Sequence, residues 1–293
     1  MTTRTEKEIL DLIYNFVEAD NRIRVVIMNG SRVNPNIQKD IFQDYDIVCY
    51  VTDVEPYKIE KDVVPYFGET IIVEQPNFGP WPPYDADGSY HNYNMQFLDG
   101  NRIDLSFFNI EKLDEKCTDS LSIVLIDKDN LCTDLPPVSE KSYFIRKPSK
   151  DQFAGCCDAF LFAIGSHIPK TIWRKELPLV KFYIEGWLRE PVQLMLSWEI
   201  GLKTGFDKSI GAKGKYLQKF LEPEKWGQYL RTYVDSNFYR IWDSLYVFYD
   251  IFIQSAIFVA KECNYRFPED NAAKVLSFLN HVRILSDDAE SIY

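Results

Sequence analysis

Three acidic side chains have types and spacing that could do chemistry. Asp44 and Asp46 stand at the start of an expected strand over 46–51, and Asp104 lies in the second arm of an expected hairpin. Residues i and i+2 of an extended chain point to the same face, so Asp44 and Asp46 should project together. Parallel carboxylates repel each other unless a cation bridges them, and carboxylate oxygens are the hard ligands that Mg²⁺ prefers. The pattern therefore predicts a divalent metal site.

Asp104 lies in a run with the alternation of a strand that has one polar face. Ile103, Leu105 and Phe107 alternate with polar residues, so the Asp104 carboxylate should lie opposite the apolar face. A third acid can then reach the Asp44–Asp46 pair across neighbouring strands. Three carboxylates would leave the remaining metal positions to water and to triphosphate oxygens.

A glycine turn precedes the first two acids. The β-branched run Ile23–Met28 ends in Asn29-Gly30-Ser31. The glycine would let backbone N–H groups approach a phosphate closely, and the Ser31 hydroxyl would add a donor. Arg32 could reach a phosphate or pair with a carboxylate. A D-x-D motif alone is more often a solvated turn, but the ordered set of strand, glycine turn, D-x-D strand, hairpin and third aspartate indicates a functional site.

The surrounding pattern predicts a sheet with helices in the first half of the chain. Thr5 and Glu8 form a capping box ahead of an amphipathic helix over 5–19. Asp99-Gly100 is the strongest hairpin signal. The turn-rich segment 76–90 is interpreted as a lobe insertion or a substrate-facing flap. The expected strands cover 23–28, 46–51, 70–73, 94–98, 102–108 and 122–126.

The second half changes to helical periodicity after an expected interdomain connection that begins at Leu135-Pro136-Pro137 and continues as a polar stretch to Lys150. Apolar residues recur there at three- and four-residue spacing. The expected helical stretches are 151–168, 174–202, 213–221, 224–232 and 238–262. The predicted class is α+β, with a mixed sheet and helices over residues 1–135 followed by an all-α domain over residues 136–293.

The composition restricts the classes of protein to which the chain can belong. Its 293 residues carry 33 Lys+Arg against 44 Asp+Glu, a formal charge of −11, which argues against nucleic-acid binding because phosphate backbones require basic surfaces. No run of about 18 apolar residues occurs, and the first ten residues are polar and charged where a secretory signal would have an apolar core. We therefore expect a soluble, cytoplasmic protein without a membrane partner.

Cysteine and histidine do not offer a soft metal site. The six cysteines contain no C-x-x-C pair, and His91, His167 and His281 are far apart in the sequence. We expect reduced, mostly buried thiols and isolated structural histidines. Any metal should be a hard cation held by carboxylates.

Longer strings around these motifs resemble a known family. They are MNGSRVNPN (28–36), KDIFQDYDIVCYVTD (39–53), DGNRIDL (99–105), IRKPS (145–149), CCDAF (156–160), WRKE (173–176), LMLSWEIGLKTGF (194–206) and GKYLQKFL (214–221). The set resembles the aminoglycoside 6-adenylyltransferases, the streptomycin-modifying enzymes of the polymerase-β type of nucleotidyltransferase, and it covers nearly the whole chain. The resemblance implies a nucleotidyltransferase domain over 1–135 and a helical acceptor-binding domain over 136–293.

The resemblance also implies an activity and its site. AMP would pass from ATP to a hydroxyl of an aminoglycoside such as streptomycin, which inactivates the antibiotic. Mg²⁺, with two ions expected, would be held by Asp44, Asp46 and Asp104. The residues expected to bind the nucleotide are Gly30, Ser31, Arg32 and Lys215. A chain charge of −11 could attract such a polycationic acceptor by steering, although it equally suits solubility.

One residue departs from the family pattern. Phe182 stands where these enzymes carry an aspartate suited to deprotonating the acceptor hydroxyl. Glu185 lies one helical turn later on the same face and is the expected catalytic base, with Glu176 as the reserve candidate. The alternatives are a nucleotidyltransferase that acts on a different acceptor and a nucleotide-binding protein without turnover. Three clustered carboxylates argue against a pure binder.

Overall fold

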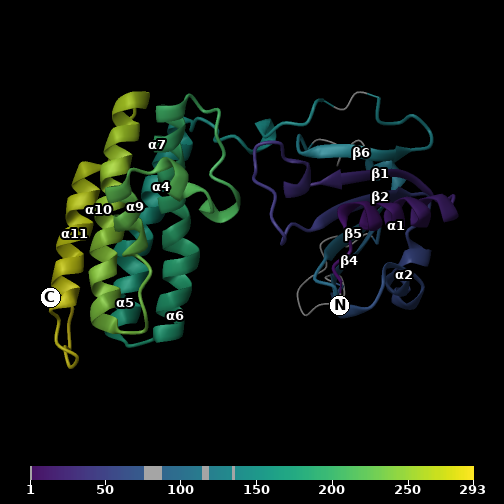
Figure 1. The fold of residues 1–293 in the computed structure, drawn as a ribbon. Helices are drawn as coiled ribbons and strands as arrows, with labels where there is room; N and C mark the ends of the chain where they lie inside the picture. The colour runs from purple at the N-terminus through teal and green to yellow at the C-terminus, as the bar shows by residue number, and fades with distance from the viewer. Residues whose placement is uncertain (1, 76–87, 114–118, 134–135) are drawn as a thin grey trace. The chain divides into compact units, whose positions relative to one another are not determined.

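The computed structural model contains two compact units, Met1–Ser142 and Tyr143–Tyr293, and each is described by itself (Figure 1). It describes residues 2–75, 88–113, 119–133 and 136–293. The division lies after Ser142, whereas the sequence suggested a division after residue 135. The first unit contains a sheet with helices and the second is helical, so the predicted α+β class is confirmed.

The first unit is built on a six-stranded sheet in the order β3-β4-β5-β2-β1-β6. Its strands are β1 (Ile23–Asn29), β2 (Tyr45–Val51), β3 (Thr70–Glu74), β4 (Tyr90–Phe97), β5 (Arg102–Asn109) and β6 (Ser122–Asp127). β2 and β5 are parallel, whereas the other neighbouring pairs in this sheet are antiparallel. The strands expected from the sequence are confirmed, and the sheet is mixed.

Two helices cover one face of this sheet, α1 (Glu6–Ala19) and α2 (Glu60–Phe67). Thr5 caps α1 in a capping box with Glu8, as the sequence predicted. The apolar side of α1 buries Ile9, Ile13 and Val17 in the same cluster as the inward side chains of β1, β2, β4 and β5. Burial of this stripe stabilises both the helix and the sheet.

The opposite face of the sheet is apolar at one end and polar at the other. Tyr50 and Phe108 belong to a small apolar cluster on this face. Farther along the same strands, Asp46 pairs with Asp104 and Asp104 pairs with Asn94 in the sheet register. Side chains at even spacing along a strand share a face, so these polar groups lie in one row.

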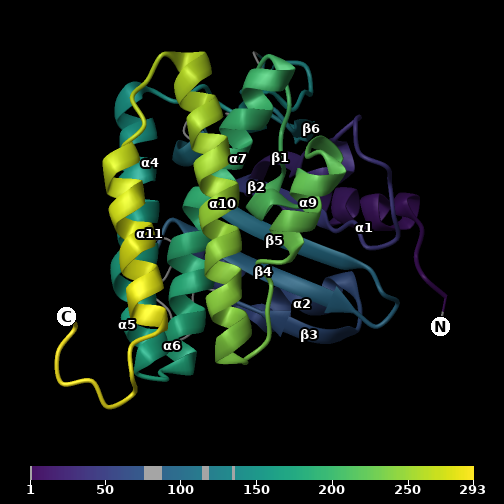
Figure 2. The same ribbon diagram turned by 90° about the vertical axis from the view of Figure 1, so that its left-hand side faces the viewer.

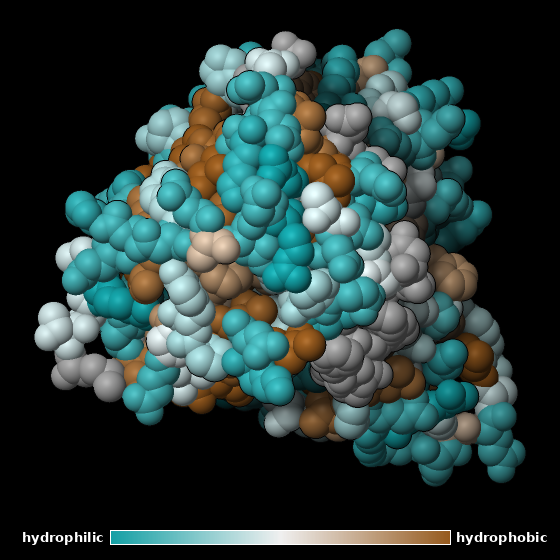
Figure 3. Space-filling view, turned by 90° about the vertical axis from the view of Figure 1, so that its right-hand side faces the viewer, coloured by the Kyte–Doolittle hydropathy of each residue, from teal (hydrophilic) through white to brown (hydrophobic). Residues whose placement is uncertain are grey.

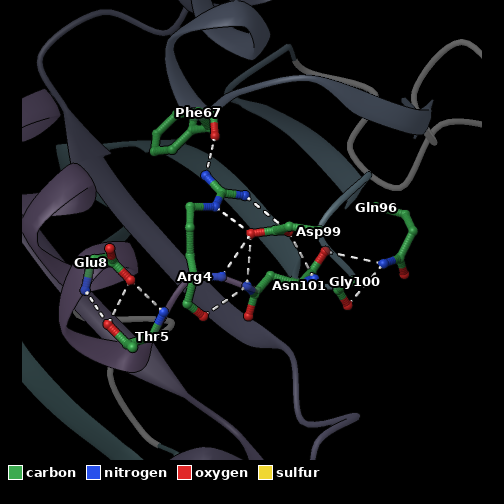
Figure 4. A network of polar contacts seen from close by, with 8 residues as sticks. All are labelled: Arg4, Thr5, Glu8, Phe67, Gln96, Asp99, Gly100 and Asn101. Carbon is green, nitrogen blue, oxygen red and sulfur yellow. Dashed lines mark hydrogen bonds and ion pairs between the residues drawn. The ribbon is translucent and has the colours of Figure 1, made fainter. Parts of the chain in front are cut away.

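A polar network fixes the turn of the β4–β5 hairpin to the start of the chain (Figure 4). Arg4 Nε donates to Asp99 Oδ2 at 2.5 Å, and Arg4 Nη1 donates to the Phe67 carbonyl at 2.5 Å. Asn101 Nδ2 donates to the Arg4 carbonyl at 3.1 Å. Gly100 has a φ of +90°, which a turn of this kind requires. The network thus holds the beginning of β5 in place.

The second unit is a bundle of helices (Figure 2). They are α4 (Lys150–Phe162), α5 (Ile168–Trp173), α6 (Leu177–Phe182), α7 (Arg189–Thr204), α8 (Leu217–Phe220), α9 (Pro223–Leu230), α10 (Phe238–Cys263) and α11 (Glu269–Arg283). The π-helical segments η6 (Ala163–His167) and η7 (Tyr183–Leu188) join α4 to α5 and α6 to α7. The sequence predicted helices over most of this unit but not α11.

The core of the second unit is centred on α10. Phe252 of α10 stacks on Phe160 of α4 with ring centroids 3.8 Å apart. Among the described residues, α10 is long and apolar enough to cross a membrane, but 56% of its most apolar window is buried inside the structure. That burial is typical of a core helix.

The predicted thiols and the turn-rich segment have different outcomes. Cys49, Cys156 and Cys157 are buried and unpaired, as expected. Most of the segment interpreted as an insertion or flap, residues 76–87, lies outside the described residues, and so does Cys117.

The face in Figure 3 shows hydrophobic residues in separate patches between hydrophilic ones, which is ordinary for a protein surface.

Candidate active site

The three predicted carboxylates meet at one place on the polar face of the sheet. β2 and β5 lie side by side with Asp46 directly opposite Asp104, and Asp44 lies just before β2. One oxygen of each carboxylate lies within 4.8 Å of the other two. The structure therefore brings the three predicted carboxylates together, with Asp104 on the strand next to that of Asp46.

The three negative charges affect one another. Burial, followed by the charges of Asp44 and Asp104, raises the pKa of Asp46 to about 7. Arg102 lowers the repulsion, because its guanidinium donates to the two oxygens of Asp104 at 2.8 and 2.7 Å and lies 3.9 Å from Asp44. One guanidinium against three carboxylates leaves the cluster acidic, and an added cation would be attracted to it.

The donor set fits a hard divalent cation. All three groups are half-buried carboxylates, and carboxylate oxygens suit Mg²⁺, Ca²⁺ or Mn²⁺ rather than a thiophilic metal. Their mutual distances allow them to share a cation between two strands. Asp44, Asp46 and Asp104 are therefore the residues that could hold a metal.

Gly30 packs directly against this cluster. In the sheet register Asn29 lies opposite Asp46, and the chain turns at Gly30 with a φ of +81°. A Cβ atom at position 30 would lie 2.1 Å from Asp46 Oδ2. Only glycine satisfies both the conformation and the contact. Ser31 follows in the short helix η1 (Ser31–Val33), and its hydroxyl has no hydrogen-bond partner in the described part of the chain.

Arg32 is engaged with the backbone in front of β2. Its guanidinium donates to the carbonyls of Gln43 at 2.6 Å and Asp44 at 3.2 Å, and it stacks 3.7 Å from the Tyr45 ring centroid. It also lies 3.4 Å from the Glu6 carboxylate. These contacts hold the segment that carries Asp44. A contact of Arg32 with a nucleotide stays a prediction.

The expected base lies in the second unit, and its local structure differs from the expectation. Residues 183–188 are π-helical, so the α-helical spacing that placed Glu185 on the face of Phe182 was wrong. Phe182 is 58% exposed. Glu185 accepts hydrogen bonds from Arg189 at 2.5 and 2.9 Å, and the buried Arg189 also donates to Thr232 at 2.8 Å. Glu185 therefore has a fixed structural partner, and its catalytic role stays a prediction.

The other predicted residues of the second unit are less constrained. Lys215 is exposed after the short helix η8 (Ala212–Gly214), with its ammonium 5.1 Å from the centroid of the Tyr216 ring. Glu176 is half-buried at the start of α6. The triad and Gly30 thus come together within the first unit, whereas Glu185, Glu176 and Lys215 belong to the second.

Two amides beside the triad were missed by the sequence reasoning. Asn92 and Asn94 of β4 lie opposite Ser106 and Asp104 on the polar face of the sheet. A signal existed, because the polar residues at 92, 94 and 96 alternate with apolar ones at 93, 95 and 97. That alternation indicates a strand with one polar face, and the sheet register shows that this face is the face of the carboxylates.

A mixed sheet that brings three carboxylates together beside a glycine turn defines the first unit as that of a nucleotidyltransferase. The family model described as streptomycin adenylyltransferase matches residues 3–282. The chain belongs to this family of nucleotidyltransferase enzymes, which confirms the resemblance.

Individual relatives extend over almost the same range. The aminoglycoside 6-adenylyltransferase of Staphylococcus aureus is 32% identical over 267 residues, covering 90% of this chain and 94% of the relative. The enzyme of the same name from Campylobacter jejuni is 33% identical, covering 90% and 91%. A crystal structure of an aminoglycoside 6-adenyltransferase from Bacillus subtilis has 26% identity and a TM-score of 0.48, covering 96% of this chain and 100% of that chain.

Proposed function

We propose that this protein transfers AMP from ATP to a hydroxyl of an aminoglycoside such as streptomycin, and so inactivates the antibiotic in the cytoplasm. The observation that carries the proposal is the contact of the carboxylate cluster with the Gly30 turn in a chain of this family. Relatives that are 32 and 33% identical are named aminoglycoside 6-adenylyltransferases. Their names supply the acceptor class.

The first unit would bind the reacting end of the nucleotide. Asp44, Asp46 and Asp104 would hold Mg²⁺, with two ions expected. Bound Mg²⁺ would neutralise charge on the polyphosphate during in-line transfer. The N–H groups next to Gly30 and the Ser31 hydroxyl would donate to phosphate oxygens, since glycine allows close approach of the backbone. Arg32 would hold the segment before β2, and Lys215 would contribute a positive charge to the triphosphate.

The acceptor must bind as a cation and lose one proton. Three carboxylates beside one guanidinium and a chain charge of −11 favour a polycation. Glu185 is proposed as the group that takes the proton from the acceptor hydroxyl, with Glu176 in reserve. A different acceptor, or nucleotide binding without turnover, is the alternative that Phe182 raises, because phenylalanine cannot accept a proton.

The proposal is tested by AMP transfer from labelled ATP with Mg²⁺ and a panel of aminoglycosides. Asp46→Asn and Asp104→Asn should each abolish transfer. Asp53→Asn is the matched control, because Asp53 follows the other end of β2 and is exposed. It should keep wild-type activity. Transfer by the wild type to a non-aminoglycoside alone would identify a different acceptor, and near-normal turnover in either triad variant would remove the triad from the mechanism.

A second measurement separates a functional cluster from a structural one. Asp46→Asn should raise the thermal unfolding temperature in the presence of EDTA, because it removes a half-buried charge beside two like charges. Asp53→Asn should leave that temperature unchanged. A lower unfolding temperature for Asp46→Asn would indicate that Asp46 stabilises the fold, and would weaken its role as a metal ligand.

A further inference from the structure

A row of polar groups continues from the carboxylates to the edge of the sheet. Asp104 of β5 lies opposite Asn94 of β4, and Asn94 lies opposite Glu74 of β3. Asn92 is on the same face of β4, opposite Ser106. Side chains two residues apart on a strand share a face, so Asn92 and Asn94 both belong to the face of the triad.

The hydrogen bonds in this row fix the direction of each amide. Asn94 Nδ2 donates to Glu74 Oε2 at 2.9 Å, and an ionised carboxylate can only accept. Asn94 Oδ1 therefore accepts, and it does so from Asn92 Nδ2 at 2.8 Å. The carboxylate of Glu74 thus orients the Asn94 amide, and Asn94 in turn orients the Asn92 amide. The carbonyl oxygen of Asn92 takes no part in these two hydrogen bonds.

That oxygen has no partner of its own. Asn92 Oδ1 is buried and accepts no hydrogen bond from the described residues, and Asn92 as a whole is 7% exposed. A buried amide oxygen without a donor is unfavourable, because it has lost water without gaining a hydrogen bond. A donor from a bound molecule would remove this cost.

The sheet order indicates which substrate supplies the donor. The Gly30 turn follows β1, on one side of the β2–β5 pair, whereas β4 and β3 lie on the other side. In-line transfer places the attacking hydroxyl opposite the leaving pyrophosphate. With the triphosphate at the Gly30 turn, the acceptor approaches from the side of β4. The carboxylates of Asp104 and Glu74 flank this approach and favour a cation.

We propose that Asn92, oriented by Asn94 and Glu74, accepts a hydrogen bond from an ammonium, guanidinium or hydroxyl group of the acceptor. Asn92 is then a specificity-determining residue, and Asn94 and Glu74 are positioning residues. This inference rests on the proposed function, since it assigns the acceptor to one side of the triad.

Asn92→Leu tests the inference, because leucine has a similar size and no hydrogen-bonding group. The KM for streptomycin should rise roughly 10- to 100-fold, as for a lost hydrogen bond to a charged donor, and the KM for ATP should change by less than about twofold. Gln96→Leu is the matched control. Gln96 lies on the same face of β4, but its amide donates to the Gly100 and Asn101 carbonyls, so both KM values should stay within about twofold.

Glu74→Gln tests the relay at an exposed position where the fold should tolerate the change. A glutamine can donate or accept, so the direction of the amides is no longer determined. The KM for streptomycin should rise by a smaller factor than in Asn92→Leu, with the KM for ATP unchanged. If Asn92→Leu does not fold, Glu74→Gln decides the outcome, and an unchanged KM for streptomycin then overturns the inference.

Other outcomes separate the inference from the proposed function. If folded Asn92→Leu has the wild-type KM for streptomycin, Asn92 Oδ1 is satisfied by water only and the inference is wrong. A rise confined to the KM for ATP would place the nucleotide there and overturn it as well. If the wild type modifies no aminoglycoside, the proposed function fails. The inference is then decided by a binding experiment, in which streptomycin is titrated calorimetrically into the full chain in the presence of a non-hydrolysable ATP analogue. Weaker binding to Asn92→Leu supports it, whereas equal binding, or none to the wild type, overturns it.

Discussion

Gly30 and Asp46 approach each other so closely that position 30 admits no side chain. The ideal Cβ would lie 2.1 Å from Asp46 Oδ2, and the φ of +81° is unfavourable for every residue except glycine. The conformation of the turn and its distance from the carboxylate are therefore set by the same residue. Backbone N–H groups of the turn can lie next to the cluster only because that side chain is missing.

Gly30→Ala should lower kcat/KM for AMP transfer by at least about 100-fold, and it should lower the free energy of unfolding by about 1–3 kcal/mol. Gly100→Ala is the matched control, since Gly100 also has a positive φ of +90° but a Cβ there would meet nothing within 4 Å. Gly100→Ala should also lower the free energy of unfolding, but it should keep wild-type activity. Enzyme assays and thermal unfolding of both variants check this, and equal activities would show that the close approach is not needed.

At the residue scale the sequence predicted the triad but not the amides next to it. Strand alternation is local, so it was enough to place Asp44, Asp46 and Asp104 on polar faces. The pairing of Asp104 with Asn94 depends on which strands are neighbours, and a single sequence does not specify register between distant segments. Asn92 therefore became visible as a candidate only in the folded sheet.

At the scale of single elements, the β4–β5 hairpin depends on a charged contact far along the chain. Burial acts to raise the pKa of Asp99, but hydrogen bonds from Arg4 and Asn101 outweigh it and hold that pKa well below its ordinary value. The folded state therefore favours the ionised carboxylate. This contact links the residues before α1 to the turn from which β5 starts.

Asp99→Asn should lower the free energy of unfolding by about 1–2 kcal/mol at pH 7. A carboxyl group whose pKa is depressed in the folded state contributes stability above its unfolded pKa of about 3.9 and loses that contribution as the pH falls. The difference between wild type and variant should therefore shrink below about pH 4 in urea titrations. Asp11→Asn, which breaks an exposed pair with Lys7, should leave the free energy of unfolding nearly unchanged at both pH values. A difference that is constant with pH would contradict this account.

The π-helical segment η7 changes which residues are neighbours. Phe182 contacts Trp187, five residues on, with ring centroids 6.2 Å apart, whereas Glu185 pairs with Arg189. The amino-acid pattern predicted a continuous helix here, because apolar spacing does not distinguish an α-helical turn from an inserted π turn. The error in the position expected for Glu185 has this cause.

Glu185→Gln separates a catalytic role from a structural one. If Glu185 is the base, kcat should fall about 10²–10⁴-fold while the KM for ATP is unchanged. If Glu185 serves only Arg189, kcat should persist, and the stability should fall because a buried guanidinium loses its charged partner. Glu190→Gln, at a neighbouring exposed position, is the control and should change neither. Full activity of Glu185→Gln with the true acceptor would show that Glu185 is not the base. Glu176→Gln would then be tested in the same way.

At the scale of the whole molecule, the chain contains separate apolar cores in its two units. Helical periodicity predicted most of the second unit, since long helices with one buried face carry a strong signal. α11 was missed because its buried residues are few, namely Ala272, Leu279 and Val282. The two compact units divide after Ser142, within the polar connection that the sequence indicated between Leu135 and Lys150.

Separate cores should give separate responses to a core substitution. Phe252→Ala removes a fully buried ring from the second unit and should destabilise that unit by about 3–5 kcal/mol. Phe162→Ala, at a side chain that is 63% exposed on α4, should have little effect. Scanning calorimetry should show the transition of the second unit shifted and that of the first unchanged. A single transition that shifts as a whole would show that the units unfold together.

The parallel pairing of β2 with β5 has a consequence for the order of events during synthesis. Tight turns cannot connect parallel neighbours, and α2, β3 and β4 all lie between these two strands in the chain. After Asp44 and Asp46 have been synthesised, the third carboxylate does not join them until the β4–β5 hairpin has formed and β5 has paired with β2. Pairing between such distant segments is slow compared with local hairpin closure. The complete cluster of three carboxylates therefore exists only once β5 has paired with β2.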